Sequence, residues 1–161
     1  MGNSTFSGPI RSENGFKSIV KNSTTGAVTS DFTLQTFSVT IVLPATGTTG
    51  IKSAELIPIN FIPMGVAVTV VIATANNVNL NDIGTDADPD GFVDGIASTL
   101  NTKGFKGFHG CNGVLGMSGF TTGASGLTGD EVEIAISGAT GGTGATLALK
   151  FFGISSDSPT A

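Results

Sequence analysis

The side chains with the clearest potential for chemistry are four aspartates within a stretch of nine residues. They occupy positions 1, 3, 5 and 9 of that stretch, and they are Asp86, Asp88, Asp90 and Asp94. With Gly91 at position 6, this spacing matches the start of a calcium-binding loop, in which alternate side chains converge on one cation. An EF-hand also needs a bidentate glutamate at position 12, where this chain has Ala97, so an EF-hand is excluded.

A shorter calcium loop remains open at these aspartates. Four carboxylates this close in sequence repel one another unless a cation lies between them, which favours a metal site. The alternative is an acidic surface turn whose carboxylates are hydrated. Calcium is therefore the one cofactor that the sequence suggests.

The chain has one histidine, His109, and one cysteine, Cys111. A histidine that acts as a general base needs a partner that orients it. Extended backbone flanked by glycines does not hold a catalytic side chain rigidly. No Gly-x-Ser-x-Gly nucleophile motif is present either. We expect a packed or interfacial histidine beside a small buried thiol, and a protein that is not an enzyme.

Glycine occurs at every third position from Gly104 to Gly119, and the period resumes from Gly123 to Gly129. A period of three matches neither a strand nor an α-helix, and it predicts an extended, polyproline-II-like path. The run contains no proline, so a collagen helix is excluded. Large apolar residues follow several of the glycines, including Phe105, Phe108 and Phe120, and these predict a subunit interface.

Alternating apolar residues predict strands in the rest of the chain, and no segment has the 3.6-residue period of a helix. The expected strands are 16–20, 31–43, 51–62, 65–75, 131–137 and 145–154, with a β-bulge or a strand bend where the alternation changes phase at Gln35 and Thr36. We therefore expect an all-β protein, an antiparallel β-sandwich of jelly-roll type. Residues 16–161 would form this single domain, with the segment 104–129 as a long glycine-rich excursion.

Residues 1–15 are polar apart from Phe6 and Ile10. We expect them to form an ordered, extended N-terminal arm in which these two side chains contact a neighbouring chain.

Composition limits the remaining function classes. The 161 residues carry a formal net charge of −5 and no basic stripe, which argues against a nucleic-acid partner. The sequence has no run of 18 apolar residues, so we expect no membrane span. The N-terminus lacks the pattern of a signal peptide. Only 12% of residues are charged, whereas glycine contributes 24 residues, as expected for short strands joined by turns.

The N-terminal sequence from Asn3 to Lys17, NSTFSGPIRSENGFK, resembles the opening of small virion proteins of tailed bacteriophages. The segments 81–95 and 104–116 are similar to such proteins in composition. This resemblance implies a head decoration or cement protein: a β-rich, frequently trimeric protein on the capsid exterior that bridges subunits of the major capsid protein. It carries over no catalytic residues. The chain would be made in the host cytoplasm and act in the virion.

A phage fibre or spike protein is the alternative function. In that case the Asp86–Asp94 loop would bind calcium and assist attachment to host glycans. The absence of tryptophan and tyrosine weighs against sugar stacking, for which only phenylalanine is available.

Overall fold

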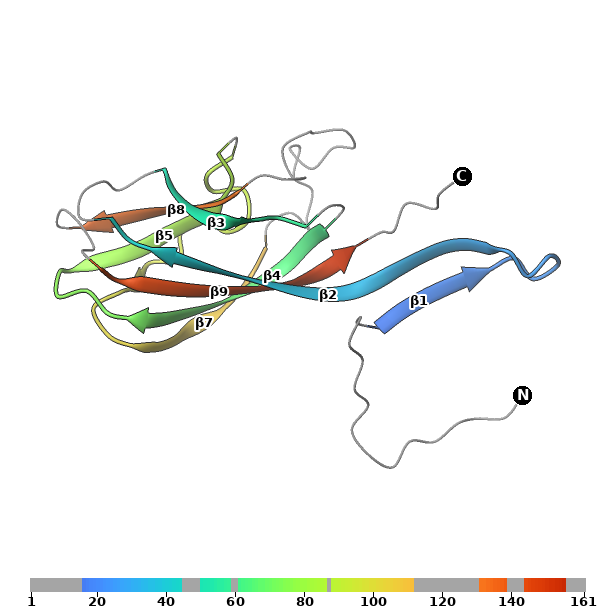
Figure 1. Ribbon diagram of the computed structural model, residues 1–161, viewed down its shortest axis with the longest axis horizontal. Coiled ribbons are helices and arrows are strands. Elements are labelled where there is room, and N and C mark those ends of the chain that lie inside the picture. The colour runs from blue at the N-terminus through green and yellow to red at the C-terminus, as the bar shows by residue number, and fades with distance from the viewer. Residues whose placement is uncertain are drawn as a thin grey trace, which may run out of the picture.

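The computed structural model describes residues 16–44, 50–58, 61–86, 88–111, 131–138 and 144–155. Every regular element in these residues is a β-strand, which confirms the all-β prediction (Figure 1). The strands are β1 (Phe16–Lys21), β2 (Val28–Val42), β3 (Ile51–Leu56), β4 (Phe61–Ile72), β5 (Val78–Gly84), β6 (Ser98–Thr99), β7 (Gly104–Gly110), β8 (Glu131–Gly138) and β9 (Thr146–Ser155).

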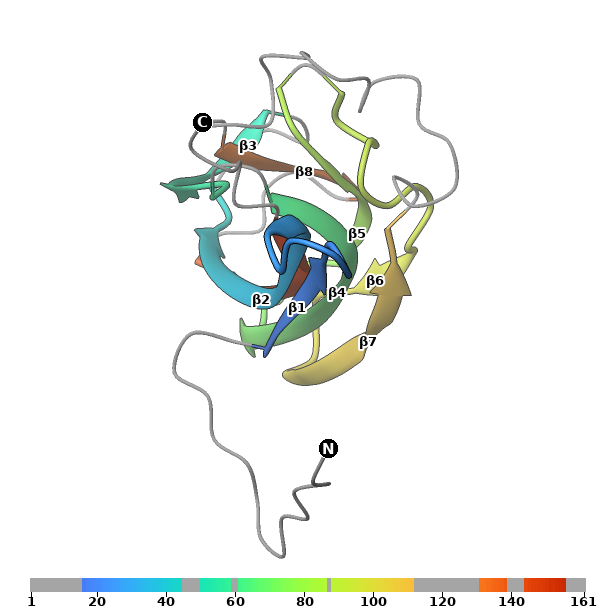
Figure 2. The ribbon, with the colours of Figure 1, turned by 90° about the vertical axis from the view of Figure 1, so that its right-hand side faces the viewer.

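The strands form two antiparallel sheets, which face each other across a shared core (Figure 2). Sheet A has the order β1-β2-β9-β4-β7, and sheet B has the order β3-β8-β5-β6. Four pairings are nested along the chain: β2 with β9, β3 with β8, β4 with β7, and β5 with β6. Strand β1 pairs only with the first half of β2, and this two-stranded arm projects beyond the rest of sheet A (Figure 1).

Alternating residues of both sheets fill the core. The predicted apolar positions Val132, Ile134 and Ile136 of β8 are buried, as are Leu147 and Leu149 of β9. Aromatic rings connect the layers. The Phe151 ring stacks on Phe37 at a centroid distance of 4.7 Å and meets Phe92, from the loop after β5, edge-on at 5.6 Å.

The β-bulge predicted at Gln35 and Thr36 is absent. Strand β2 pairs with β9 without a register shift from Thr33 to Val42. The change of phase has another cause: Val39 and Ile41 are buried in the core, whereas Leu34 lies on the opposite, exposed face of sheet A. The apolar positions of β2 thus switch from one face of the strand to the other without a bulge, because the first half of β2 extends beyond sheet B.

Prolines and register shifts explain two further differences from prediction. The segment 51–62 is not one strand, because β3 ends before Pro58 and β4 begins at Phe61. Pro63 lies within β4 at a register shift, where a missing N–H is tolerated. A second shift after Val70 places Ile72 on the exposed side, although the alternation predicted it to be buried.

The first part of the glycine-triplet segment is a strand, not a polyproline-II-like path. Strand β7 pairs with β4, with a register shift at which Gly107 pairs with Val68 and Phe105 pairs with Thr69. The skipped residue, Lys106, is the extra residue of a bulge. This bulge brings Phe105 and Phe108 to one face although they are three residues apart. Strands β5 and β6 were not predicted.

Several predictions lie outside the described residues. These are the arm 1–15 with Phe6 and Ile10, and the later part of the glycine-rich segment with Phe120.

Candidate functional site

The loop after β5 folds back onto the end of its own strand. The Thr85 and Gly91 backbone N–H groups both donate to the Asp88 carbonyl, at 2.9 and 3.0 Å, and Val93 forms an isolated bridge with Ile83. Gly84 permits this close return, because a Cβ at that position would collide with the Asp88 backbone carbonyl and with Pro89. The loop therefore has a defined backbone geometry that rests on a glycine.

Asp86 is neutralised by a lysine from another strand. The Lys52 ammonium lies 2.8 Å from the Asp86 carboxylate and 4.0 Å from that of Glu131. The hydrogen bond from Lys52 holds the pKa of Asp86 below its usual range, and the same bond raises the pKa of Lys52. The lowered carboxyl pKa means that this pair stabilises the fold at neutral pH, and that the contribution is lost as pH falls through that pKa.

Sequence reasoning did not identify Lys52, because only strand pairing brings it to the loop. Lys52 of β3 pairs with Glu133 of β8, and Glu133 pairs with Gly84 at the end of β5. Glu133 is only 5% exposed, and its Oε1 accepts a hydrogen bond from the Gly50 N–H at 3.1 Å. No signal in the local sequence marks these residues as neighbours of Asp86.

The four predicted calcium ligands do not gather around one point. Asp86 is paired with Lys52, Asp94 is exposed, and Asp88 interacts with Asp90. Within the described part of the chain, no group of three or more His, Cys, Asp or Glu side chains is placed to hold a metal ion. Burial and the neighbouring Asp90 raise the pKa of Asp88 above its usual 3.8, because both disfavour the charged form of its carboxyl group.

Replacement of Asp88 by asparagine is expected to raise the melting temperature at pH 7 by about 1–3 °C. A carboxyl group whose folded-state pKa is raised destabilises the fold increasingly as pH rises through that pKa. The neutral amide removes that penalty, so the gain should vanish near pH 3, where the native carboxyl is protonated. Melting curves of both proteins at the two pH values, by circular dichroism, measure this. An equal gain at both values would contradict the electrostatic explanation.

His109 and Cys111 lie at the end of β7 and beyond it. The His109 side chain is half-buried, and its Nε2 has no hydrogen-bond partner among the described residues. Cys111 is buried, and burial raises the pKa of its thiol to about 12. Such a thiol is not a nucleophile at neutral pH.

Most of the exposed large apolar side chains among the described residues belong to the strands of sheet A. Strand register aligns side chains of β2, β9, β4 and β7 in rows across the sheet. One row on the outer face consists of Thr40, Ala148, Thr69 and Phe105, and the next row consists of Ser38, Lys150, Ala67 and Phe108. Phe105 is 65% exposed and Phe108 is 54% exposed. Eight of the nine large apolar side chains that are exposed belong to sheet A: Leu34, Val42, Ile62, Met64, Val71, Ile72, Phe105 and Phe108.

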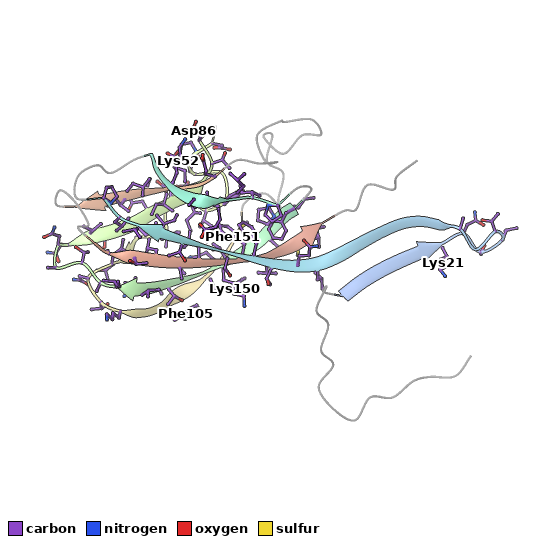
Figure 3. All side chains as sticks on the ribbon, in the orientation of Figure 1. Lys21, Lys52, Asp86, Phe105, Lys150 and Phe151 are labelled. Carbon is purple, nitrogen blue, oxygen red and sulfur yellow. The ribbon has the colours of Figure 1, made fainter. Side chains whose placement is uncertain are left out.

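The two predicted interface residues on β7 are thus brought to one surface. The Phe108 ring packs against Phe152 of β9, with their centroids 5.0 Å apart. Both rings lie over Gly65, where a Cβ would collide with them. Figure 3 shows Phe105 and Lys150 on this side of the molecule, with Lys52 and Asp86 on the opposite side and Phe151 between the sheets. Exposed apolar side chains that gather on one face are typical of protein–protein interaction sites.

Comparison of the chain with protein-family models, with curated proteins and with solved structures finds no match. Among the described residues, no helix is long and apolar enough to cross a membrane.

Proposed function

We propose that this chain is a non-enzymatic structural protein of a phage virion, which decorates the capsid exterior and stabilises it by bridging major capsid subunits. The observation that carries the proposal is the outer face of sheet A, on which Phe105 and Phe108 are exposed beside other apolar side chains. Exposure of these apolar side chains to water is unfavourable. Contact with another protein would bury them, and this best explains why the face is apolar.

The order in which the strands pair supports the same assignment. We interpret the nested pairs β2–β9, β3–β8, β4–β7 and β5–β6 as a jelly roll, in which an antiparallel ribbon is folded into two sheets. Viral capsid proteins and lectins are among the proteins built on this architecture. Fold alone does not assign a function, so this support is by analogy.

The proposed function predicts stoichiometric binding to capsids that lack this chain. The test mixes the purified protein with such capsids, separates bound from free protein by sedimentation, and measures occupancy. We also propose that the free protein is a trimer, as the resemblance to decoration proteins implies, and its mass in solution tests this. Failure to bind would contradict capsid decoration.

Deletion of residues 2–15 tests the second part of the proposal, in which the N-terminal arm clamps a capsid neighbour. The truncated protein should keep its β-sheet circular dichroism spectrum and lose capsid binding. Normal occupancy by the truncated protein would show that the arm is not the clamp.

A fibre or spike protein that binds calcium is the second candidate, and the Asp88–Asp90 pair favours it. Two carboxyl groups forced together gain most from a divalent cation. This function predicts that millimolar calcium raises the melting temperature of the native protein, and that Asp88→Asn abolishes the rise. It also predicts calcium-dependent binding to host cells, which capsid decoration does not require.

A further inference from the structure

The two sheets carry opposite formal charges. Sheet A and the residue before β7 hold five lysines against one aspartate, a formal charge of +4. The residues are Lys17, Lys21, Lys103, Lys106, Lys150 and Asp31. Sheet B and the loop after β5 hold eight acidic residues against Lys52, a formal charge of −7. They are Glu55, Asp82, Asp86, Asp88, Asp90, Asp94, Glu131 and Glu133.

One of these lysines, Lys150, lies on the outer face of sheet A among its apolar side chains. Lys150 is exposed, and in its row across the sheet it is flanked by Ser38 and Ala67. From Leu34 to Val42, the exposed residues of β2 include no acidic side chain, and the same holds for the described faces of β4, β7 and β9. Among the described residues, the ammonium group of Lys150 therefore has no acidic neighbour on this face.

We propose that this face docks onto an acidic, partly apolar surface of another protein. The inference rests on the proposed function, under which that surface belongs to the capsid shell. A carboxylate of the partner opposite Lys150 would supply the negative charge that this face lacks, while Phe105 and Phe108 provide the apolar contact. Large apolar side chains that lose contact with water on binding contribute much of the binding energy of an interface.

A twofold or stacked contact with a second copy of the chain fits this face less well, so the expected trimer would use other surfaces. Two copies related by a twofold axis would place one lysine-bearing face against another, and like charges across an interface disfavour binding. Stacking sheet A of one copy on the acidic sheet B of the next would satisfy the charges. The two faces lie on opposite sides of the molecule, however, so such contacts would repeat into an open filament instead of closing into a ring (Figure 3).

A negatively charged membrane also fits less well. Binding to anionic lipid typically uses clusters of four to eight basic residues at one site. Here Lys150 stands among uncharged neighbours on the face, and the chain as a whole carries a formal charge of −5. Vesicle binding is therefore an outcome of the test, not part of the proposal.

The test compares Phe105→Asp and Lys150→Glu with the control Leu56→Asp for binding to capsids that lack the chain. Leu56 is a matched control because it is 55% exposed on β3, the edge strand of sheet B, as Phe105 is on β7, the edge strand of sheet A. We expect each sheet A variant to weaken capsid binding by about tenfold or more, and the control to stay within about twofold. Added salt should weaken native binding and have less effect on Lys150→Glu.

Each outcome has one meaning. If the native protein binds capsids and all three variants bind equally well, the docking face is wrong while capsid decoration stands. If the native protein does not bind capsids, both proposals fail. If native protein binds vesicles of phosphatidylserine and phosphatidylcholine more tightly than capsids, the partner is a membrane and the inference is overturned. Circular dichroism of each variant establishes that it is folded.

Discussion

Replacement of Phe151 by alanine is expected to lower the free energy of unfolding by about 3–5 kcal/mol. The Phe151 side chain is fully buried at the centre of the core. Its ring lies parallel to Phe37, with an angle of 5° between the planes, and it also contacts Phe92 from the loop after β5. The truncation removes both aromatic contacts and leaves a cavity that the sheets cannot close, because each is held by its own strand pairing. Urea unfolding monitored by circular dichroism measures the loss.

Phe105→Ala is the matched control for this loss. Phe105 belongs to the same sheet and has the same side chain, but it is mostly exposed. Its truncation should change the free energy of unfolding by no more than about 0.5 kcal/mol. A similar destabilisation by both variants would mean that Phe105 is covered by part of the same chain, and it would remove the basis for a docking face.

Gly84→Ala should destabilise the fold by about 1–3 kcal/mol and displace the acidic loop. The new Cβ would collide with backbone atoms of Asp88 and Pro89, which cannot move as a flexible side chain can. To avoid this collision the loop would have to move away from β5, and that movement would break the hydrogen bond between the Thr85 N–H and the Asp88 carbonyl. Hydrogen exchange of the loop amides, together with urea unfolding, measures both effects.

Gly110→Ala supplies the control for a strand glycine. A Cβ at Gly110 meets nothing within 4 Å, and its backbone has no left-handed conformation. The substitution should leave stability nearly unchanged or raise it slightly by restricting the unfolded chain. If Gly84→Ala behaved in the same way, the loop would not be held against the end of β5.

The strands that were predicted correctly are those with strict alternation of apolar residues. In β8 and in β9 as far as Phe151, each inward apolar residue of the alternation is large, so local pattern and burial agree. Strand β5 was missed because its alternation covers only the first four residues of VNLNDIG before a register shift changes the phase, and β6 was missed because it has only two residues. The glycine period led to a wrong prediction for β7, because a bulge at Lys106 allows a strand to place residues three apart on one face.

In the candidate sites too, features that depend on neighbours in sequence could be predicted, whereas features that depend on strand pairing could not. The spacing of the aspartates indicated either a calcium loop or an acidic turn, and the backbone of the described loop does turn tightly around Asp88, since turn geometry depends on neighbours in sequence. The pairing of Asp86 with Lys52 could not be predicted, because two strand pairings, β3 with β8 and β8 with β5, separate the two residues.

The sequence by itself determined the all-β class, the low charge and the positions of the exposed phenylalanines, because these follow from composition and short-range periodicity. Only the tertiary structure decided that Phe105, Phe108 and Lys150 share one outer face and that the acidic residues gather around the other sheet. The physical reason is that antiparallel pairing joins residues far apart in the chain, and register then selects the face on which each side chain lies.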